Sequence, residues 1–296
     1  MSRLARVVVV TFSPGEVLEG LLDSLAGTSA RGVEVVLADN GSVDGAPERA
    51  ARERPEVRVL HTGGNVGYGS AVNAAMADVR TGWVLVANPD VRFLGDAVGE
   101  MLAAADRWPR AATVGPLIRT PEGEVYPSAR DVPSMSTGIG HALLGFAWPR
   151  NPWTARYRRE REAPRERPAG WLSGACLLVD AQAFHSVGGF DPAYFMYFED
   201  VDLGDRLGAG GWRHVYAPSA EIVHEGGHST KRVQGVMRRA HHVSALRFLS
   251  ARHPGPSRAP LRLALRAGLA ARLAASSLSE RIDAGAAPAG RDDRSP

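Results

Sequence analysis

Three carboxylates stand within four positions of the chain, at Glu199, Asp200 and Asp202, directly after the aromatic segment 194–198. Acidic side chains this close repel one another, and apolar neighbours further disfavour their ionised forms. Such a cluster indicates proton transfer, a bound metal or a cationic ligand. The simpler alternative is a helix N-terminus, where acidic side chains interact favourably with the helix dipole.

Other polar positions directly follow predicted strands. Asp39 comes after the strand at 33–37, where its carboxylate could accept hydrogen bonds from a nucleobase or a ribose, or cap the next helix. Asn88 and Asp90 flank a proline after the strand at 83–87. The carboxylate of Asp90 could hold Mg²⁺ or Mn²⁺ on a diphosphate, because these metals keep substrate oxygens as ligands. The alternative there is an Asx turn.

His224 follows another short predicted strand, at 221–223. A lone histidine in such a place is more often structural than a ligand. Together with a carboxylate such as Asp90, however, an imidazole suits Mn²⁺. The two residues therefore form a candidate metal site.

A glycine-rich turn at 63–69 follows the predicted strand at 57–60. Its glycines are ordered Gly64-x-x-Gly67-x-Gly69. The dinucleotide fingerprint instead reads G-x-G-x-x-G and occupies the first strand–helix turn. This difference argues against a nicotinamide-dependent oxidoreductase, and a plain turn is the alternative to a binding loop.

Alternating apolar segments predict the elements that position these residues. Strands are predicted at 6–12, 33–37, 57–60 and 83–87, and helices at 15–27, 45–54, 70–79 and 95–106. This alternation predicts an α/β fold with right-handed crossovers and a mostly parallel sheet. Ligands of such sheets bind at the carboxyl ends of the strands, which is where the polar clusters fall.

The second half of the chain is less regular. It is predicted to contain strands at 114–118, 124–126, 171–180, 215–217 and 221–223, and helices at 181–190, 200–209, 231–251 and 259–278. The segment 127–170 is rich in Pro, Arg and Trp, and is interpreted as a long loop or a small helical insertion. The last residues, 281–296, are predicted to be disordered.

Composition restricts the compartment and the partners. The chain has 296 residues, 44% of them hydrophobic, which is enough for one large domain with an appendage. The single cysteine, Cys176, excludes an intrachain disulfide and suits a reducing compartment. The N-terminal residues do not form a signal peptide, and no apolar run reaches the roughly 20 residues of a spanning helix. We therefore expect a cytoplasmic or peripheral membrane protein.

Basic residues are unevenly distributed although the net charge is only +3. No nucleic-acid motif accompanies them, so we expect no nucleic-acid partner. The arginines of the insertion could bind an acceptor diphosphate or anionic lipid, or lie in a solvated loop; they are Arg150, Arg156, Arg158, Arg159, Arg161, Arg165 and Arg167. A leucine stripe at 261, 265, 269 and 273 beside Arg262, Arg266 and Arg272 predicts a membrane-surface helix, or a helix packed on the domain or in a homodimer.

The order of these motifs resembles family 2 inverting glycosyltransferases of the GT-A fold, over residues 6–232. The matching motifs are the strand-one Val-Val-Thr-Phe at 9–12, Asp39-Asn40-Gly41-Ser42-x-Asp44, Gly64-Asn65-x-Gly67-x-Gly69 with Asn73, Asn88-Pro89-Asp90, Gly174-Ala175, Glu199-Asp200-Val201-Asp202 and His224. The stretch 188–203 is most similar to the rhamnosyltransferase branch. The resemblance implies a single mixed, mostly parallel sheet flanked by helices, in a domain 1–232 with a C-terminal helical extension.

The resemblance also implies a domain plan and site roles. A nucleotide-binding half, 1–110, would precede an acceptor half, 111–232, that contains the insertion 127–170; a basic helical extension, 233–280, and the tail would follow. Asp200 would be the catalytic base, helped by Glu199 and Asp202. The donor would contact Thr11, Asp39, Asn40, Gly64, Asn65, Gly67, Asn73, Asn88 and Asp90, and the acceptor Trp171, Gly174, Ala175 and Glu199. Asp90 and His224 would hold the metal, because Asn88 replaces the first acid of the family's D-x-D motif.

The implied reaction is metal-dependent transfer of L-rhamnose from dTDP-rhamnose to N-acetylglucosamine on a polyprenyl diphosphate, in cell-wall or polysaccharide assembly. An inverting transfer needs one base opposite the leaving group and a divalent metal, Mg²⁺ or Mn²⁺, on the departing diphosphate. The alternatives are another donor, such as a galactofuranose or hexose nucleotide, or a catalytically silent nucleotide-sugar-binding protein. A sugar nucleotidyltransferase would need basic residues in the loop after the first strand, and residues 11–15 contain none.

Overall fold

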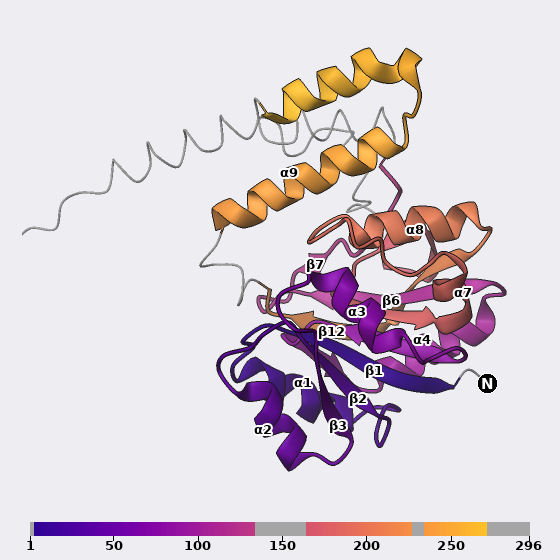
Figure 1. Ribbon diagram of the computed structural model, residues 1–296. Helices are drawn as coiled ribbons and strands as arrows, with labels where there is room; N and C mark the ends of the chain where they lie inside the picture. Colours follow the sequence, from indigo (N-terminus) through magenta and orange to yellow (C-terminus); the bar gives the residue numbers. More distant parts are fainter. Residues whose placement is uncertain (1–2, 134–163, 227–233, 271–296) are drawn as a thin grey trace, which may run out of the picture. The chain divides into compact units, whose positions relative to one another are not determined.

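The computed structural model describes residues 3–133, 164–226 and 234–270 (Figure 1). The chain divides into two compact units, Met1–Arg232 and Val233–Pro296, and each is described by itself. Five arginines of the predicted insertion, at 150, 156, 158, 159 and 161, lie outside the described residues, as do Leu273, Arg272 and the segment 281–296.

The described part of the first unit contains a mixed sheet with strand order β3-β2-β1-β4-β11-β6-β12-β5. Its first four strands pair in parallel and are β1 (Leu4–Thr11), β2 (Val35–Asp39), β3 (Val57–His61) and β4 (Trp83–Ala87). The other half comprises β5 (Val91–Leu94), β6 (Ala111–Arg119), β11 (Cys176–Asp180) and β12 (Arg213–His224). There β6 and β12 are parallel, whereas β11 and β5 run antiparallel to their neighbours.

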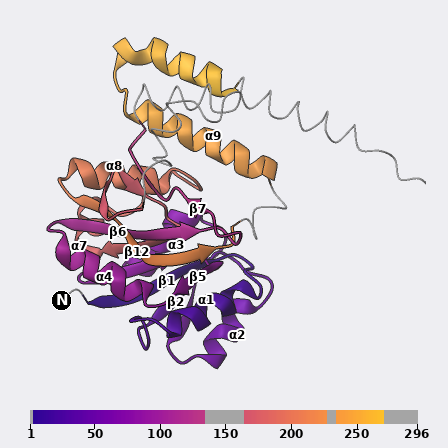
Figure 2. The same ribbon diagram turned by 180° about the vertical axis from the view of Figure 1, so that it is seen from behind.

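Helices cover both faces of this sheet (Figures 1 and 2). One face packs against α1 (Val17–Ala26), α2 (Ala46–Glu53) and α4 (Ala97–Arg107). The other face packs against α3 (Tyr68–Met76), α7 (Ala181–Ser186) and α8 (Glu199–Ala209). Because both faces are buried, the central strands are almost continuously apolar rather than alternating.

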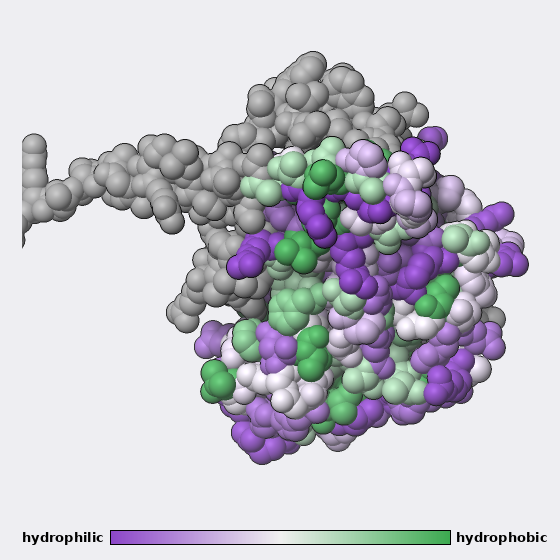
Figure 3. Space-filling model, turned by 45° about the horizontal axis from the view of Figure 1, so that its top comes forward, coloured by the Kyte–Doolittle hydropathy of each residue, from purple (hydrophilic) through white to green (hydrophobic). Residues whose placement is uncertain are grey.

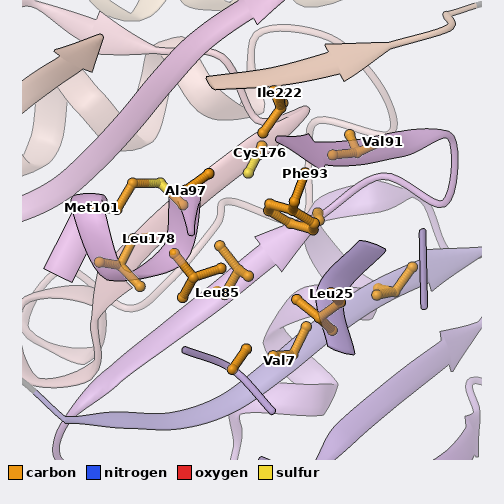
Figure 4. Packing of buried hydrophobic residues seen from close by; sticks show 14 of the residues in the cluster. Val7, Leu25, Leu85, Val91, Phe93, Ala97, Met101, Cys176, Leu178 and Ile222 are labelled. Atoms are coloured by element: carbon orange, nitrogen blue, oxygen red, sulfur yellow. The ribbon is translucent and has the colours of Figure 1, made fainter. Parts of the chain in front are cut away.

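The core on the first face is made by side chains from distant parts of the sequence. Figure 4 shows Val7, Leu25, Leu85, Phe93 and Met101 around one apolar volume, and all five are at most 6% exposed. Strands β1 and β4 therefore form the rigid centre of the unit. Thr11 is the last residue of β1, and the segment 88–90 directly follows β4.

Several short strands were not expected from the sequence. They are β5, β8 (Ala129–Arg130) and β9 (Arg167–Ala169). Segments of two to four residues carry too little periodicity to be recognised, and they form here only by pairing with a partner strand. Strand β9 pairs with β12, and β8 pairs with β10 (Trp171–Leu172) in a separate two-stranded sheet, so the prediction of a single sheet was incomplete.

Two predicted boundaries differ from the structure. The expected strand 171–180 is interrupted at residues 173–175, which separate β10 from β11. The two expected strands 215–217 and 221–223 are one strand, β12, whose register against β6 shifts between Ala217 and Glu221. A strand was predicted at 124–126, and the structure has β7 (Val125–Tyr126) there, paired antiparallel with β6.

The second unit is helical where the structure describes it. It contains α9 (Gln234–Ala251), a 3-10 turn at Pro256–Arg258 and a helix that continues from 259 to 270. No helix within the described residues is both long and apolar enough to cross a membrane. On the face shown in Figure 3, the described residues mix hydrophilic and hydrophobic side chains.

Candidate functional site

The acidic cluster occupies the first turn of α8, and Asp200 is held by backbone donors. Its Oδ2 accepts a hydrogen bond of 3.0 Å from the N–H of Gly174, and its Oδ1 accepts one of 2.8 Å from the N–H of Val201. Burial raises the pKa of Asp200, and the bonds from Gly174 and Val201 and the charge of Arg130 oppose that rise only in part. The result is a fixed carboxylate with an increased affinity for a proton.

Glu199 lies beside Asp200 and is 8% exposed. Burial, together with the charge of Asp200, raises the pKa of Glu199 to about 8. Its Oε2 has no hydrogen-bond partner among the described residues. An ionised carboxylate would be costly in this position, so the pair carries less than two negative charges at neutral pH.

Asp202 serves a different purpose from its two neighbours. Its Oδ2 accepts a 2.7 Å bond from Arg206, one turn later in α8. Arg206 also donates to the carbonyl oxygens of Val187 and Gly189, at 2.7 and 2.8 Å. Asp202 therefore stabilises the loop that enters α8, and this geometry places it in a supporting position.

The loop before α8 contains unusual backbone conformations. Tyr197 and Phe198 have φ values of 66° and 68°, in the left-handed region that side-chain-bearing residues rarely adopt. Strain of this kind persists only where the surrounding structure imposes it, and it clusters at functional sites. Here it directs the chain into α8 so that Glu199 and Asp200 become its first residues.

The glycine-rich turn packs directly against this loop. A Cβ on Gly67 would lie 2.4 Å from the carbonyl oxygen of Phe195, and a Cβ on Gly69 would lie 2.8 Å from Cβ of Phe190. The N–H of Tyr68 donates to the same Phe195 oxygen at 3.3 Å. The predicted donor turn and the acidic loop are therefore in contact, and the glycines allow that approach.

Asn73 also connects these two parts of the chain. Its Nδ2 donates to the carbonyl oxygen of Phe190 at 2.8 Å, and its Oδ1 accepts from the Phe190 N–H at 2.9 Å. Both ends of the amide are thus occupied by backbone groups. This geometry makes Asn73 a clamp on the loop; its predicted contact with the donor stays a prediction.

Asp90, His224 and Asn88 lie close together, in the segment after β4 and at the end of β12. Nε2 of His224 lies 3.1 Å from Oδ1 of Asp90 and 3.3 Å from Nδ2 of Asn88. The antiparallel pairing of β12 with β5, which sets His224 opposite Val91, brings them together. A buried carboxylate beside an imidazole and a carboxamide fits a divalent metal that keeps several ligand positions for a substrate.

Asp39 lies at the end of β2 and is 3% exposed. Its carboxylate accepts hydrogen bonds from the hydroxyls of Thr11 and Ser42, at 2.9 and 2.5 Å, and from the backbone of Gly41 and Ser42. Burial alone would raise the pKa of Asp39, but these hydrogen bonds lower it, so the carboxylate is ionised. The predicted neighbour Asn40 donates from Nδ2 to the carbonyl oxygen of Gly67 at 3.3 Å.

A second candidate metal group, not foreseen from the sequence, surrounds Asp39. Ligand atoms of Asp39, Glu48 and His61 lie within 4.8 Å of one another. However, the Asp39 carboxylate already accepts the hydrogen bonds just described. Strand β1 also separates β2 from β4, the strand that leads to Asp90. Of the two groups, Asp90 with His224 is the better fit to a metal on a diphosphate.

Trp171 was predicted to contact an acceptor sugar, but its side chain is only 6% exposed. Its indole N–H donates to the carbonyl oxygen of Asp131 at 3.1 Å, and the guanidinium of Arg130 lies 5.3 Å from the centre of its ring. A Cβ on Gly204 of α8 would lie 2.6 Å from Cβ of Trp171. Trp171 thus packs against α8 in this structure. Its stacking on a sugar stays a prediction.

Gly174 and Ala175 occupy the interruption between β10 and β11. The carbonyl oxygen of Ala175 accepts a 2.9 Å bond from the N–H of Asn88, and Gly174 contacts Asp200 as described. This short loop therefore touches both the Asn88–Asp90 segment and the acidic pair. Sequence reasoning missed two neighbours of the pair, Tyr68 and Arg130; for Tyr68 the signal was its place inside the glycine-rich turn.

Four large apolar side chains are exposed in loops near the site. Phe12, Val43, Val66 and Phe195 are 46%, 93%, 41% and 44% exposed. They come from the loops that follow β1, β2 and β3 and from the loop before α8.

Comparisons with known proteins agree with this geometry. A family model described as glycosyl transferase family 2 matches residues 6–188. An N-acetylglucosaminyl-diphospho-decaprenol L-rhamnosyltransferase of Mycobacterium tuberculosis is 54% identical over 283 residues, which cover 92% of both chains. The rhamnosyltransferase WbbL of Escherichia coli K12 is 28% identical over 64% of this chain and 72% of its own length.

Solved structures show the same fold at low sequence identity. The mannosyltransferase PcManGT of Pyrobaculum calidifontis, in complex with GDP-Man and Mn²⁺, covers 98% of this chain and 76% of its own, with a TM-score of 0.57 and 18% identity. GalNAc-T7 with UDP, GalNAc and Mn²⁺ covers 76% of this chain and 43% of its own, with a TM-score of 0.56 and 14% identity. The predicted GT-A architecture is thereby confirmed.

Proposed function

The chain belongs to glycosyl transferase family 2, and we propose that it transfers L-rhamnose from dTDP-rhamnose to N-acetylglucosamine linked to a polyprenyl diphosphate. The observation that supports this acceptor is the 54% identity, over 92% of both chains, to a relative named for the same acceptor type and sugar. The proposed identity of the donor nucleotide rests on the resemblance to the rhamnosyltransferase branch. The product would serve cell-wall assembly.

Asp200 is the proposed catalytic base. An inverting transfer requires a base that takes the proton of the acceptor hydroxyl on the face opposite the leaving group. The raised pKa of Asp200 and its fixed position above Gly174 support this role. Glu199 would help to orient the acceptor with Gly174 and Ala175, while Asp202 would act through the loop that it stabilises.

The donor would bind along the ends of β1, β2 and β3. The ionised carboxylate of Asp39, oriented by Thr11, would accept hydrogen bonds from the base or ribose of the nucleotide. Asn40 and the turn from Gly64 through Asn65 to Gly67 would border the same nucleotide. The contact between this turn and the loop before α8 supports a donor site next to the base.

A divalent metal, Mg²⁺ or Mn²⁺, would be held by Asp90 and His224 beside Asn88. When bound, it would neutralise charge on the departing nucleotide diphosphate. The solved neighbours with Mn²⁺ support a metal in this fold but do not select the ion.

The remaining parts of the plan concern the acceptor and the membrane. Residues 1–110 would bind the donor, and 111–232 the acceptor. Of the arginines predicted to bind its diphosphate, Arg165 is exposed, whereas Arg167 packs over Tyr216 and donates to the Ala129 oxygen. The basic extension 233–280 would contact the cytoplasmic face of an anionic membrane or a second copy of the chain.

A thermal-shift panel of nucleotide sugars with and without Mn²⁺ or Mg²⁺ tests the donor, and a transfer assay with a short-chain polyprenyl-diphosphate N-acetylglucosamine tests the acceptor. A selective shift with dTDP-rhamnose and formation of the disaccharide lipid are expected. A larger shift with a galactofuranose or hexose nucleotide would favour the alternative donor. Binding without transfer to any acceptor would favour a silent binding protein.

A further inference from the structure

Tyr68, the first residue of α3, belongs to the glycine-rich turn and contacts the loops on either side of the acidic pair's helix entry. Its backbone N–H donates to Phe195 at 3.3 Å, and its hydroxyl donates to the carbonyl oxygen of Gly174 at 2.5 Å. The ring packs edge-on against Phe190, with centroids 6.2 Å apart. Tyr68 therefore connects the glycine-rich turn, on the proposed donor side of the site, with the Gly174 loop that contacts Asp200.

Gly174 is held between Tyr68 and Asp200. A Cβ on Gly174 would lie 3.6 Å from Cε1 of Tyr68 and 3.6 Å from Cβ of Asp200. The carbonyl oxygen of Gly174 accepts from Tyr68, and its N–H donates to Asp200 Oδ2 at 3.0 Å. Glycine has the largest backbone freedom of any residue, so a bond to its carbonyl restricts the direction of its N–H.

The Tyr68 hydroxyl is a donor at every working pH. Burial raises the pKa of Tyr68 well above its ordinary value, and the carboxylates of Glu199, Asp200 and Asp90 add to the rise, as does Cys176. A phenol that keeps its proton continues to hold the Gly174 carbonyl while the carboxylates around it titrate.

We infer that Tyr68 is a positioning residue for the catalytic base: its hydroxyl fixes Gly174 so that the Gly174 N–H orients Asp200 and stabilises its ionised form. A hydrogen bond to a carboxylate favours ionisation, so this bond limits the rise in pKa that burial imposes. The inference rests on the proposed role of Asp200 as the base. It adds Tyr68, on α3, to the residues that support the proposed base on α8.

The test compares Tyr68→Phe with Tyr216→Phe. Both remove one hydroxyl, from the half-buried ring of Tyr68 or from the buried ring of Tyr216, which lies on β12. Phenylalanine keeps the contact with Phe190, so the fold should be retained, as a melting curve would verify. A site-specific 3-fluorotyrosine at position 68 keeps the hydroxyl and should behave like the wild type.

The first measurement needs no substrate. In protein labelled with ¹³C at the aspartate carboxyls, the Asp200 resonance is assigned by its loss in Asp200→Asn. In Tyr68→Phe we expect the pKa of Asp200 to rise by about half a unit to one unit, because its backbone donor is no longer fixed. The groups that face Asp200, namely Glu199 and Arg130, are unchanged in both variants.

The second measurement is the pH profile of transfer by the full-length enzyme. In Tyr68→Phe the acidic limb of kcat/KM should move to higher pH by the same amount, and kcat should fall about tenfold while the KM for the donor stays within about twofold. An unmoved Asp200 titration, equal to that of Tyr216→Phe, would overturn the inference. A shifted titration in an enzyme that transfers no rhamnose would retain the inference and reject only the proposed substrates.

Discussion

The carboxylate oxygen Oδ1 of Asp90 lies 3.1 Å from Nε2 of His224, although the two residues are far apart in the sequence. From this pair we predict that binding of a divalent metal depends on both Asp90 and His224. Asp90→Ala and His224→Ala should each weaken Mn²⁺ binding in the presence of the donor nucleotide by about 10- to 100-fold, because a carboxylate or an imidazole ligand is lost. Titration of free Mn²⁺ by electron paramagnetic resonance measures the change.

His61→Ala is the matched control for that experiment. It removes the histidine of the other candidate group, Asp39 with Glu48, without touching Asp90. We expect His61→Ala to bind Mn²⁺ like the wild type. If His61→Ala loses the metal and His224→Ala keeps it, the metal lies at the end of β2 and our assignment is wrong.

Asp200→Asn should abolish most of the transfer while leaving donor binding largely intact. Asparagine keeps the size of the side chain but cannot accept the proton, and general-base catalysis contributes about 10²–10⁴-fold. Single-turnover transfer and calorimetric titration of the donor separate the two effects. Asp205→Asn, on the same helix, is the control and should retain activity; turnover retained by Asp200→Asn would remove this residue as the base.

The fold of residues 1–110 could be predicted from the sequence more completely than that of residues 111–232. The apolar segments around Val8, Val36 and Leu85 are buried on both faces, so their composition alone identifies them as central strands. Because these strands are parallel, the polar residues that follow them lie at the same edge of the sheet. By contrast, β8 and β9 contain two and three residues and exist only through their partners.

The sequence indicated candidate site residues but not the contacts among them. Acidity and spacing indicated Asp200 and Glu199, and strand ends indicated Asp39 and Asp90. No sequence rule reveals that Tyr68 reaches Gly174, because that bond joins positions 106 residues apart. The left-handed backbone at Tyr197 and Phe198 was equally hidden, since aromatic residues rarely adopt it.

Gly67→Ala should destabilise the protein more than Gly63→Ala. Both glycines have positive φ values, 86° and 84°, so both substitutions incur a backbone cost. Only at Gly67 would the new Cβ meet a backbone atom, the Phe195 oxygen at 2.4 Å, whereas nothing lies within 4 Å at Gly63. We expect an additional loss of about 1–3 kcal/mol in the free energy of unfolding, measured in urea. Equal losses would show that the turn and the loop do not pack as described.

Deleting residues 256–296 should reduce association with anionic liposomes. The deleted segment begins before the helix from 259 to 270, which carries Arg262 and Arg266 beside Leu265 and Leu269. Basic residues near an anionic surface each contribute about 1 kcal/mol, and salt screens that attraction. Sedimentation with phosphatidylglycerol vesicles at low and high salt measures it, with neutral vesicles as the control. Equal partitioning of the truncated and full-length chains would reject the membrane role.

Glu199→Gln should change how stability depends on pH. The pKa of Glu199 is raised to about 8 in the folded protein, chiefly by burial and then by Asp200. As pH rises from about 4.5 to 8, the unfolded chain therefore loses this proton while the folded chain retains it, so the wild type loses stability with rising pH. Glutamine cannot ionise, and the variant should gain about 1–3 kcal/mol over the wild type between pH 5 and pH 8 in urea unfolding. Glu53→Gln, exposed at the end of α2, is the control. A difference between Glu199→Gln and the wild type that stays constant over this range would mean that Glu199 is already ionised at pH 5 in the folded protein.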